Sequence, residues 1–334
     1  MRAYIIRRLI WMVFVVFGMT LIVFVVTHLI PAEPATIAAG LGASADSIQA
    51  IRKEFALDRP LYEQYWIYLK GLLHGNLGRS ILTGRPVLDD IKDRFPATLE
   101  LALVSTFTSL LMGVSLGVLS AVSKDRFADN FIRLLSILWV GMPEFWLALM
   151  LQILFYGELG WLPAGGRTAV ELAGPPRITG MFTVDALLSL RFGILANVLK
   201  HLILPVTALS LVRMAELTRM TRSGMLEVLQ QDYIRTARAK GLSQMRVLAT
   251  HAVKNASLPV ITIIGIQFGY ALGGTVLIEA IFQWPGIGRY AVHSIQNVDF
   301  QAVIGVAVVL SGVFVLVNLF VDLLYTFADP RIRY

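Results

Sequence analysis

Long hydrophobic stretches separated by polar segments dominate the pattern of this sequence. A helix needs roughly 20 mostly apolar residues to cross a bilayer core of ~30 Å. Five stretches reach that length, and only the third contains a charged residue, Glu144, in its interior. The stretches are residues 9–30, 101–123, 134–156, 258–278 and 300–321. We interpret each as a membrane-spanning helix.

A sixth span is predicted where the apolar pattern is shortest. Residues 201–212 carry no charge, but Lys200 and Arg213 flank them. The span reaches full length over residues 197–217 if these cations extend towards the interfaces. The composition agrees, because only 15% of the residues are charged, against about 25% in a soluble domain. The predicted fold class is an all-α membrane protein with six transmembrane helices.

The basic residues predict the orientation of these helices. Three arginines precede the first apolar stretch, which is too long for a cleaved signal peptide, so residues 1–30 are interpreted as an uncleaved anchor. Residues 123–133 and 213–257 are rich in Lys and Arg, which favours the cytoplasmic side. Both termini are then cytoplasmic. The net charge of +7 reflects this topology rather than nucleic-acid binding.

The spans divide the chain into four predicted parts. These are the anchor helix (1–30), an extracytoplasmic segment (31–97), a five-helix core (98–325) with a cytoplasmic loop at 218–257, and a cytoplasmic tail (326–334).

The extracytoplasmic segment is amphipathic rather than spanning. A helix is predicted from Pro60, with Asp58 as its cap and Gly75 as its stop. Its three tyrosines and one tryptophan suit the level of the lipid headgroups. We interpret it as a helix lying on the outer membrane surface; the alternative is a docking surface for a soluble partner.

The cytoplasmic loop contains the pattern of a short capped helix. Asp232 is the predicted N-cap, Lys240 suits the negative C-terminal end, and Gly241 suits a left-handed stop. Ser243 then caps a second predicted helix, 244–257. So short a helix is marginal in water, which favours an apolar face held in a groove of another protein. The alternative is a loop that contacts only lipid headgroups. The full segment is Asp232, Tyr233, Ile234, Arg235, Thr236, Ala237, Arg238, Ala239, Lys240 and Gly241.

Several motifs resemble one known family. They are Tyr233-Ile-Arg-Thr-Ala-Arg-Ala-Lys-Gly-Leu242, His251-Ala-Val-Lys-Asn-Ala-Ser-Leu-Pro259, Gly75-Asn-Leu-Gly-Arg-Ser80, Glu279-Ala-Ile-Phe-Gln-Trp-Pro-Gly-Ile-Gly288 and Asp329-Pro-Arg-Ile-Arg333. Together they resemble the B-type permease subunit of dipeptide, oligopeptide and nickel ABC importers, over essentially the whole chain. Two positions depart from the family pattern: Pro31-Ala-Glu-Pro34 replaces Pro-Gly-Asp-Pro, and Glu144 replaces a small or apolar residue.

The resemblance implies a type I ABC importer permease fold with an extracytoplasmic insertion after the first helix, in the bacterial inner membrane. It implies that 232–241 couples to a cytoplasmic ATPase, and that the partners are a homologous second permease, two ATPase subunits and an extracytoplasmic solute-binding protein. ATP and Mg would be bound by the ATPase subunits. This chain has no Gly-x-x-x-x-Gly-Lys-Ser/Thr motif to bind them itself. The substrate stays open between dipeptides, oligopeptides, nickel, glutathione and opines.

Four residues are candidates for the pathway or its gate. Glu144 follows Pro143 in the third predicted span, where a charge costs about 2.5–3.5 kcal/mol on insertion scales. We hypothesise that it faces the pathway and attracts a cation such as a peptide amino group; an ion pair with Arg213 is the alternative. Glu279 and Trp284 precede the last span, where Trp284-Pro-Gly suits a turn. The five histidines are isolated, so no metal site is predicted.

Two other functions compete with the importer. A secondary transporter or channel for a small cationic solute would explain the spans and Glu144, but not the capped helix. A serine protease is suggested by Gly113-Val-Ser-Leu-Gly117. That motif lies within a predicted span, so Gly113 and Gly117 are better interpreted as a helix-packing surface.

Overall fold

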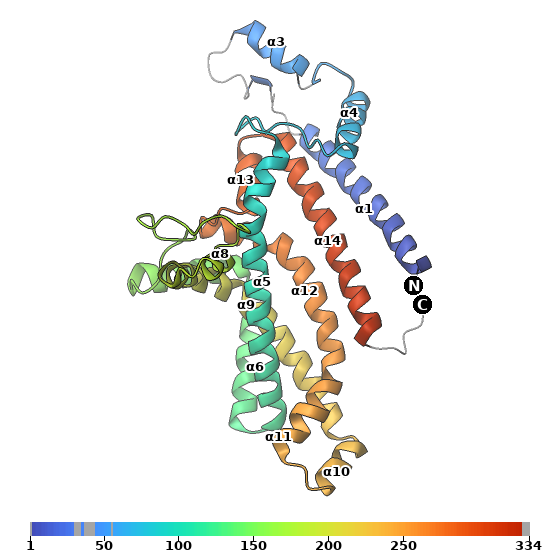
Figure 1. Cartoon of the computed structure of the whole chain (residues 1–334), viewed down its shortest axis with the longest axis vertical. Helices are drawn as coiled ribbons and strands as arrows, with labels where there is room; N and C mark the ends of the chain where they lie inside the picture. The colour runs from blue at the N-terminus through green and yellow to red at the C-terminus, as the bar shows by residue number, and fades with distance from the viewer. Residues whose placement is uncertain (1, 30–34, 37–43, 55, 329–334) are drawn as a thin grey trace. The chain divides into compact units, whose positions relative to one another are not determined.

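The described residues fold mainly into helices, and the longest described connection runs over residues 159–181 (Figure 1). The structure is a computed structural model, and it describes residues 2–29, 35–36, 44–54 and 56–328. Within these ranges the β-structure is one isolated bridge between Arg79 and Pro86. The helices are α1 (Arg2–Leu29), α3 (Ala45–Glu54), α4 (Leu61–Leu73), α5 (Val87–Val122), α6 (Phe127–Val140), α7 (Glu144–Gln152), η1 (Ile153–Glu158), α8 (Phe182–Leu188), α9 (Phe192–Leu229), α10 (Asp232–Ala239), α11 (Gln244–Arg246), η2 (Val247–Ala252), α12 (Val253–Ile281), α13 (Ile287–Gln296) and α14 (Phe300–Ala328).

The helices form two units. Unit 1 consists of Met1–Thr98 and Pro285–Val315, and unit 2 consists of Leu99–Trp284 and Leu316–Tyr334.

In unit 1, the beginnings of α5 and α14 pack against α13 around a small apolar core. Val87, Ile91, Tyr290 and Val306 are among its buried members. The approach is close, because a Cβ on Gly305 would lie 2.5 Å from Cγ1 of Val87. A second cluster joins α1, α4 and α14 through Phe24, Tyr68, Ile304 and Val308.

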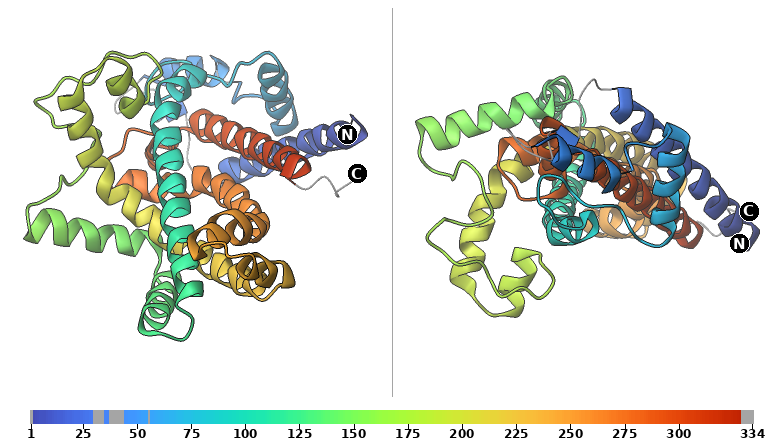
Figure 2. Two further views of the ribbon diagram at one scale, coloured as in Figure 1. Left: turned by 60° about the horizontal axis from the view of Figure 1, so that its bottom comes forward. Right: turned by 90° about the horizontal axis from the view of Figure 1, so that it is seen from above.

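In unit 2, α9 is the central helix and packs against α6, α7, α8 and α12 (Figure 2). It also crosses α5 closely. A Cβ on Gly113 would lie 2.7 Å from Cβ of Leu217, and one on Gly117 would lie 2.5 Å from Cβ of Thr221. The packing role predicted for the two glycines is confirmed. Ser115 between them is exposed and donates a hydrogen bond to the carbonyl of Leu111 at 2.6 Å, as helical serines do.

Three helices are long and apolar enough to cross a membrane: Val87–Val122, Phe192–Leu229 and Phe300–Val321. The number rises to five, among the described residues, if each of two bent pairs is one span. The helix α1 is 28 residues long, and its described apolar part, Val13–Val26, is shorter than these spans.

The prediction of one continuous span over 134–156 is wrong. The chain there forms α6 and α7, bent by 103° between Val140 and Glu144, and α7 projects steeply from α6 in Figure 2. Pro143 explains the break, because its ring disfavours helical backbone at Met142 and it has no N–H to donate.

Three predicted helix boundaries also need correction. Asp232 is the first residue of α10, Gln231 precedes it, and the Gln231 side chain makes no capping hydrogen bond. Pro60 likewise precedes α4 without a cap from Asp58. The helix predicted to end at 257 instead continues without interruption from α11 through η2 into α12. The left-handed conformation predicted for Gly241 (φ +79°) is confirmed, and Gly75, the predicted stop of the helix from Pro60, also has a positive φ of +74°.

Candidate functional site

The helix α10 is anchored on its own chain by two apolar side chains. Ile234 is fully buried and Ala237 nearly so, in a cluster with Met225 of α9, Val247 of η2 and Ala121 of α5. The left-handed turn at Gly241 allows this, because the chain then turns back and Leu242 N–H reaches the carbonyl of Ala237 at 3.3 Å. The groove expected on another protein is therefore supplied by this chain.

The remaining face of α10 is exposed and polar. The side chains of Asp232 and Arg235 are 96% and 75% exposed, and their closest charged atoms lie 3.5 Å apart. The other exposed residues are Tyr233, Thr236, Arg238, Ala239, Lys240 and Gly241. With three cations against one carboxylate, this surface suits an acidic or mixed partner surface.

The turn between α5 and α6 lies at the same end of unit 2 as α10 (Figure 1). It is fixed to α9 by Asp129, whose fully buried carboxylate accepts hydrogen bonds from Arg222 Nε and Nη2, each at 2.7 Å. Ser120 Oγ and the Asp125 N–H also donate to it, at 2.5 and 2.9 Å. Hydropathy and charge patterns did not predict this cluster. The available signal was a pair of aspartates within the otherwise basic segment 123–133.

Glu144 lies at the start of α7 and pairs with Arg213 of α9. Oε1 of Glu144 is 3.7 Å from Nε of Arg213, which is longer than a hydrogen bond. Gly274 of α12 adjoins both, since a Cβ there would lie 3.4 Å from Nη2 of Arg213. Gln267 of α12 donates to the Arg213 carbonyl at 3.3 Å and to Glu216 at 2.9 Å. Of the two roles weighed for Glu144, the geometry shows the ion pair. Pro143 immediately precedes it and is exposed.

Glu279 and Trp284 lie at the C-terminal end of α12 and are fully buried. The Trp284 N–H donates to the carbonyl of Glu279 at 2.8 Å. The Trp284 ring lies 5.6 Å from the guanidinium carbon of Arg167. Both residues are therefore part of a packed interior that fixes the loop carrying Arg167.

That loop is held by a second buried network, which the sequence patterns also did not predict. Arg167 Nη2 donates to Glu100 at 2.5 Å and to the Gly180 carbonyl at 3.0 Å, and the guanidinium stacks 3.6 Å from the Phe182 ring. Burial lowers the pKa of Arg167, and the nearby Glu100 opposes this shift.

Asp185 of α8 fixes the segment that precedes α8. Its buried carboxylate accepts from the backbone N–H groups of Ile178, Thr179 and Gly180 and from the Thr179 hydroxyl. Burial raises the pKa of Asp185, but these hydrogen bonds outweigh burial and the pKa lies below its usual value.

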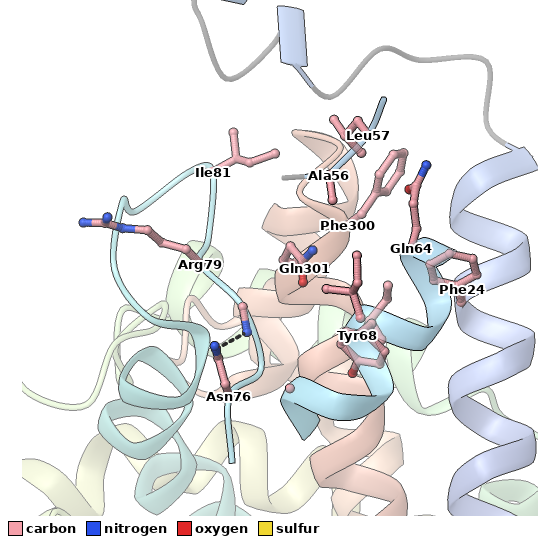
Figure 3. A pocket seen from close by; sticks show the side chains of 14 residues that line it. Phe24, Ala56, Leu57, Gln64, Tyr68, Asn76, Arg79, Ile81, Phe300 and Gln301 are labelled. Carbon is pink, nitrogen blue, oxygen red and sulfur yellow. Dashed lines mark hydrogen bonds between the residues drawn. The ribbon is translucent and has the colours of Figure 1, made fainter. Parts of the chain in front are cut away.

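Unit 1 contains a pocket of about 260 Å³ between α1, α4 and the start of α14 (Figure 3). Phe24, Tyr68 and Phe300 are among its aromatic walls. The Tyr68 hydroxyl and Gln301 Oε1 are buried without a hydrogen-bond partner among the described residues. Burial raises the pKa of Tyr68.

Long apolar helices, an internal ion pair and an anchored short helix with a polar outer face are compatible with a membrane transport subunit. The chain belongs to the family of binding-protein-dependent transport system inner membrane components. The model of that family matches residues 113–334, and the model of its N-terminal part matches residues 1–102. The predicted family is confirmed.

The relatives cover the chain along its full length. It is 47% identical over 329 residues to the probable D,D-dipeptide transport system permease protein of Escherichia coli, covering 98% of this chain and 97% of that protein. It is 44% identical over 336 residues to the dipeptide transport system permease protein of Alkalihalophilus pseudofirmus, covering 100% of both. The glutathione transport system permease protein of Escherichia coli is 35% identical over 331 residues, covering 99% of both chains.

Proposed function

We propose that this chain is one of two homologous permease subunits of an ATP-driven importer for small peptides in a bacterial inner membrane. In this proposal α1, the bent α6–α7 pair and the bent α12 complete six spans, and both termini are cytoplasmic. Two partner ATPases bind ATP and Mg and supply the energy. An extracytoplasmic binding protein delivers the solute.

The single observation that carries the coupling role is the two-sided character of α10. Ile234 and Ala237 fix the helix to α5, α9 and η2, while Arg235 and the other polar side chains remain exposed to a partner. A partner that moves α10 would therefore move the ends of those helices with it. Packed interiors transmit such displacements because they deform little, and the expected response is a rigid rocking of the helices.

Peptides are the substrate class that the relatives share. The compared proteins are named for the transport of D,D-dipeptides, dipeptides and glutathione. All of these solutes carry amide bonds, free carboxylates and an ammonium group. A transport test distinguishes peptides from nickel and opines. The reconstituted complex and its binding protein are offered labelled dialanine, nickel or an opine, and we expect uptake of dialanine.

The docking of α10 can be tested by cross-linking, because the chain has no cysteine. We expect Arg235→Cys to cross-link to a cysteine placed in the partner ATPase, and to react with an impermeant thiol reagent only from the cytoplasmic side. Val170→Cys is the control, since it is fully exposed in the loop before α8, away from α10 (Figure 1). It should react from the opposite side and give no cross-link.

Two results would contradict the proposal. Labelling of Arg235→Cys from outside would reverse the orientation. Uptake that needs a proton gradient, and continues without ATP, would favour a secondary transporter.

A further inference from the structure

Three charged residues of α9 lie in a row where α9 packs against α12, and the proposed docking of α10 does not involve them. Arg213, Glu216 and Arg219 follow one another at three-residue spacing on α9, which places neighbours close together on the helix surface. Arg213 is buried, Glu216 is half-buried and Arg219 is exposed. Glu216 and Arg219 line a cavity of about 590 Å³, together with Gln267 and Tyr270 of α12. The row therefore leads from an open cavity to a buried guanidinium.

Arg213 is incompletely paired where the row ends. Its side chain is only 7% exposed, yet Nη1 has no hydrogen-bond partner among the described residues. Glu144, which lies within ion-pair distance, is 3.7 Å away and too far for a hydrogen bond. A buried donor without a partner is costly, and more so when it is charged. A ligand that supplied a second carboxylate would remove that cost.

A glycine of α12 lies against this ion pair. Gly274 is exposed, and a Cβ there would lie 3.4 Å from Nη2 of Arg213 and 3.9 Å from Oε2 of Glu144. Gly273 is also exposed and has no atom within 4 Å of the position of a Cβ. The backbone of α12 therefore approaches the guanidinium closely at Gly274, and open space begins at the neighbouring Gly273.

We infer that Arg213 is a carboxylate-binding residue for the transported peptide, with Glu144 as its fixed counter-charge and Glu216 as the acceptor for the peptide ammonium. The inference rests on the proposed peptide-import function. A guanidinium binds a carboxylate with two parallel hydrogen bonds. A metal cation as the solute has no acceptor for these hydrogen bonds, so Arg213 would not bind it. A zwitterion also adds no net charge to a site that already contains both signs. This assignment reverses the hypothesis drawn from the sequence, in which Glu144 bound the peptide cation.

The test compares a peptide with its amide in the complete complex. Permease pair, ATPases and binding protein are reconstituted in proteoliposomes, and ATP-dependent uptake of labelled dialanine and of dialanine amide is measured. Uptake of each peptide is normalised to the unmodified complex, so the preference of the binding protein cancels. Arg213→Gln should lower relative uptake of dialanine about ten- to a hundredfold, the value of one charge-assisted hydrogen-bonded pair, and leave that of the amide nearly unchanged.

Three further variants sharpen the result. Arg213→Lys keeps the positive charge but lacks the two parallel N–H donors of a guanidinium. Its dialanine uptake should therefore lie between that of Arg213→Gln and that of the unmodified complex. Glu144→Gln should lower both KM and kcat, because the freed guanidinium holds the carboxylate more tightly and releases it more slowly. Arg191→Gln, at an exposed arginine just before α9, is the matched control and should change neither peptide.

The outcomes separate the two levels of the claim. Equal losses for dialanine and its amide in Arg213→Gln would make Arg213 structural and overturn this inference. Unchanged dialanine uptake in a folded variant, checked by its melting temperature and ATPase rate, would overturn it too. If the unmodified complex imported neither dialanine nor its amide, the proposed function itself would be overturned.

Discussion

Nε and Nη2 of Arg222 each lie 2.7 Å from one carboxylate oxygen of Asp129, so α9 and α6 are joined by a two-pronged ion pair. The two residues are 93 positions apart in the chain. Because Asp129 is fully buried and also bonded to Ser120 of α5, the pair ties three helices together. Of these helices, α5 and α9 end beside α10, the helix that we propose docks on a partner ATPase.

We expect Asp129→Asn to weaken this junction strongly. Removing one partner of a buried ion pair costs about 3–5 kcal/mol, because the other charge loses its counter-ion. The purified complex should melt at a lower temperature and hydrolyse more ATP for each peptide imported. Arg222→Lys should have a smaller effect in the same direction.

Asp125→Asn is the matched control for that prediction. Asp125 lies in the same turn but is exposed, and its backbone has a positive φ of 60°, which asparagine tolerates well. Its melting temperature and coupling ratio should stay close to those of the unmodified complex. Equal effects of the two substitutions would show that the turn's net charge matters, and not the buried pair.

The anchoring of α10 gives a second prediction. Ile234→Ala removes a fully buried side chain, a change that costs about 2–5 kcal/mol in a packed interior. A loosened α10 should still dock but transmit less movement, so transport should fall while ATP hydrolysis continues. Tyr233→Ala, at the exposed neighbour, should leave the melting temperature unchanged. Loss of ATP hydrolysis in step with transport in Ile234→Ala would contradict this account.

Local features of the sequence predicted local structure well. The short helix within the predicted segment 232–241 forms as α10, although without the predicted Asp232 cap, and the positive φ of Gly241 follows from turn preferences. The closeness of Gly113 and Gly117 to a neighbouring helix follows from their shared face. The helix with its glycine turn and the shared face of the two glycines each depend on residues that are close together in the chain. Such local relationships can be predicted from a single sequence.

Other features required knowledge of the tertiary structure. Hydropathy describes how apolar residues 134–156 are, but not the direction of the backbone, so it missed the 103° bend. Gly141 and Pro143 were the available signals for it. The pairing of Arg167 with Glu100 joins residues 67 positions apart. The sequence allowed Arg213 to be proposed as the partner of Glu144. It did not allow a choice between Arg213 and a substrate cation.

The crossing of α5 and α9 gives a third prediction. Gly117→Ala would place a methyl group 2.5 Å from Cβ of Thr221 and 2.8 Å from the Thr218 carbonyl, so the two helices must separate. We expect a loss of about 1–3 kcal/mol, as for other overpacked interiors, measured as a lower melting temperature. Gly193→Ala in α9 is the control. No atom lies within 4 Å of its Cβ position among the described residues, so it should be neutral or slightly stabilising.

The buried carboxylate of Asp185 predicts a dependence of stability on pH. Its pKa in the folded chain is below the usual value, because the hydrogen bonds from residues 178–180 outweigh the effect of burial. The ionised form therefore stabilises the fold above the unfolded pKa of about 3.9. That contribution is lost as the pH falls through the still lower folded pKa. Asp185→Asn should melt below the unmodified complex at neutral pH, and the gap should narrow as the pH drops below about 4. Thermal melting from neutral pH to the lowest pH the complex tolerates tests this. Since every other carboxylate is common to both proteins, a gap independent of pH would show that the charge of Asp185 contributes nothing to the effect.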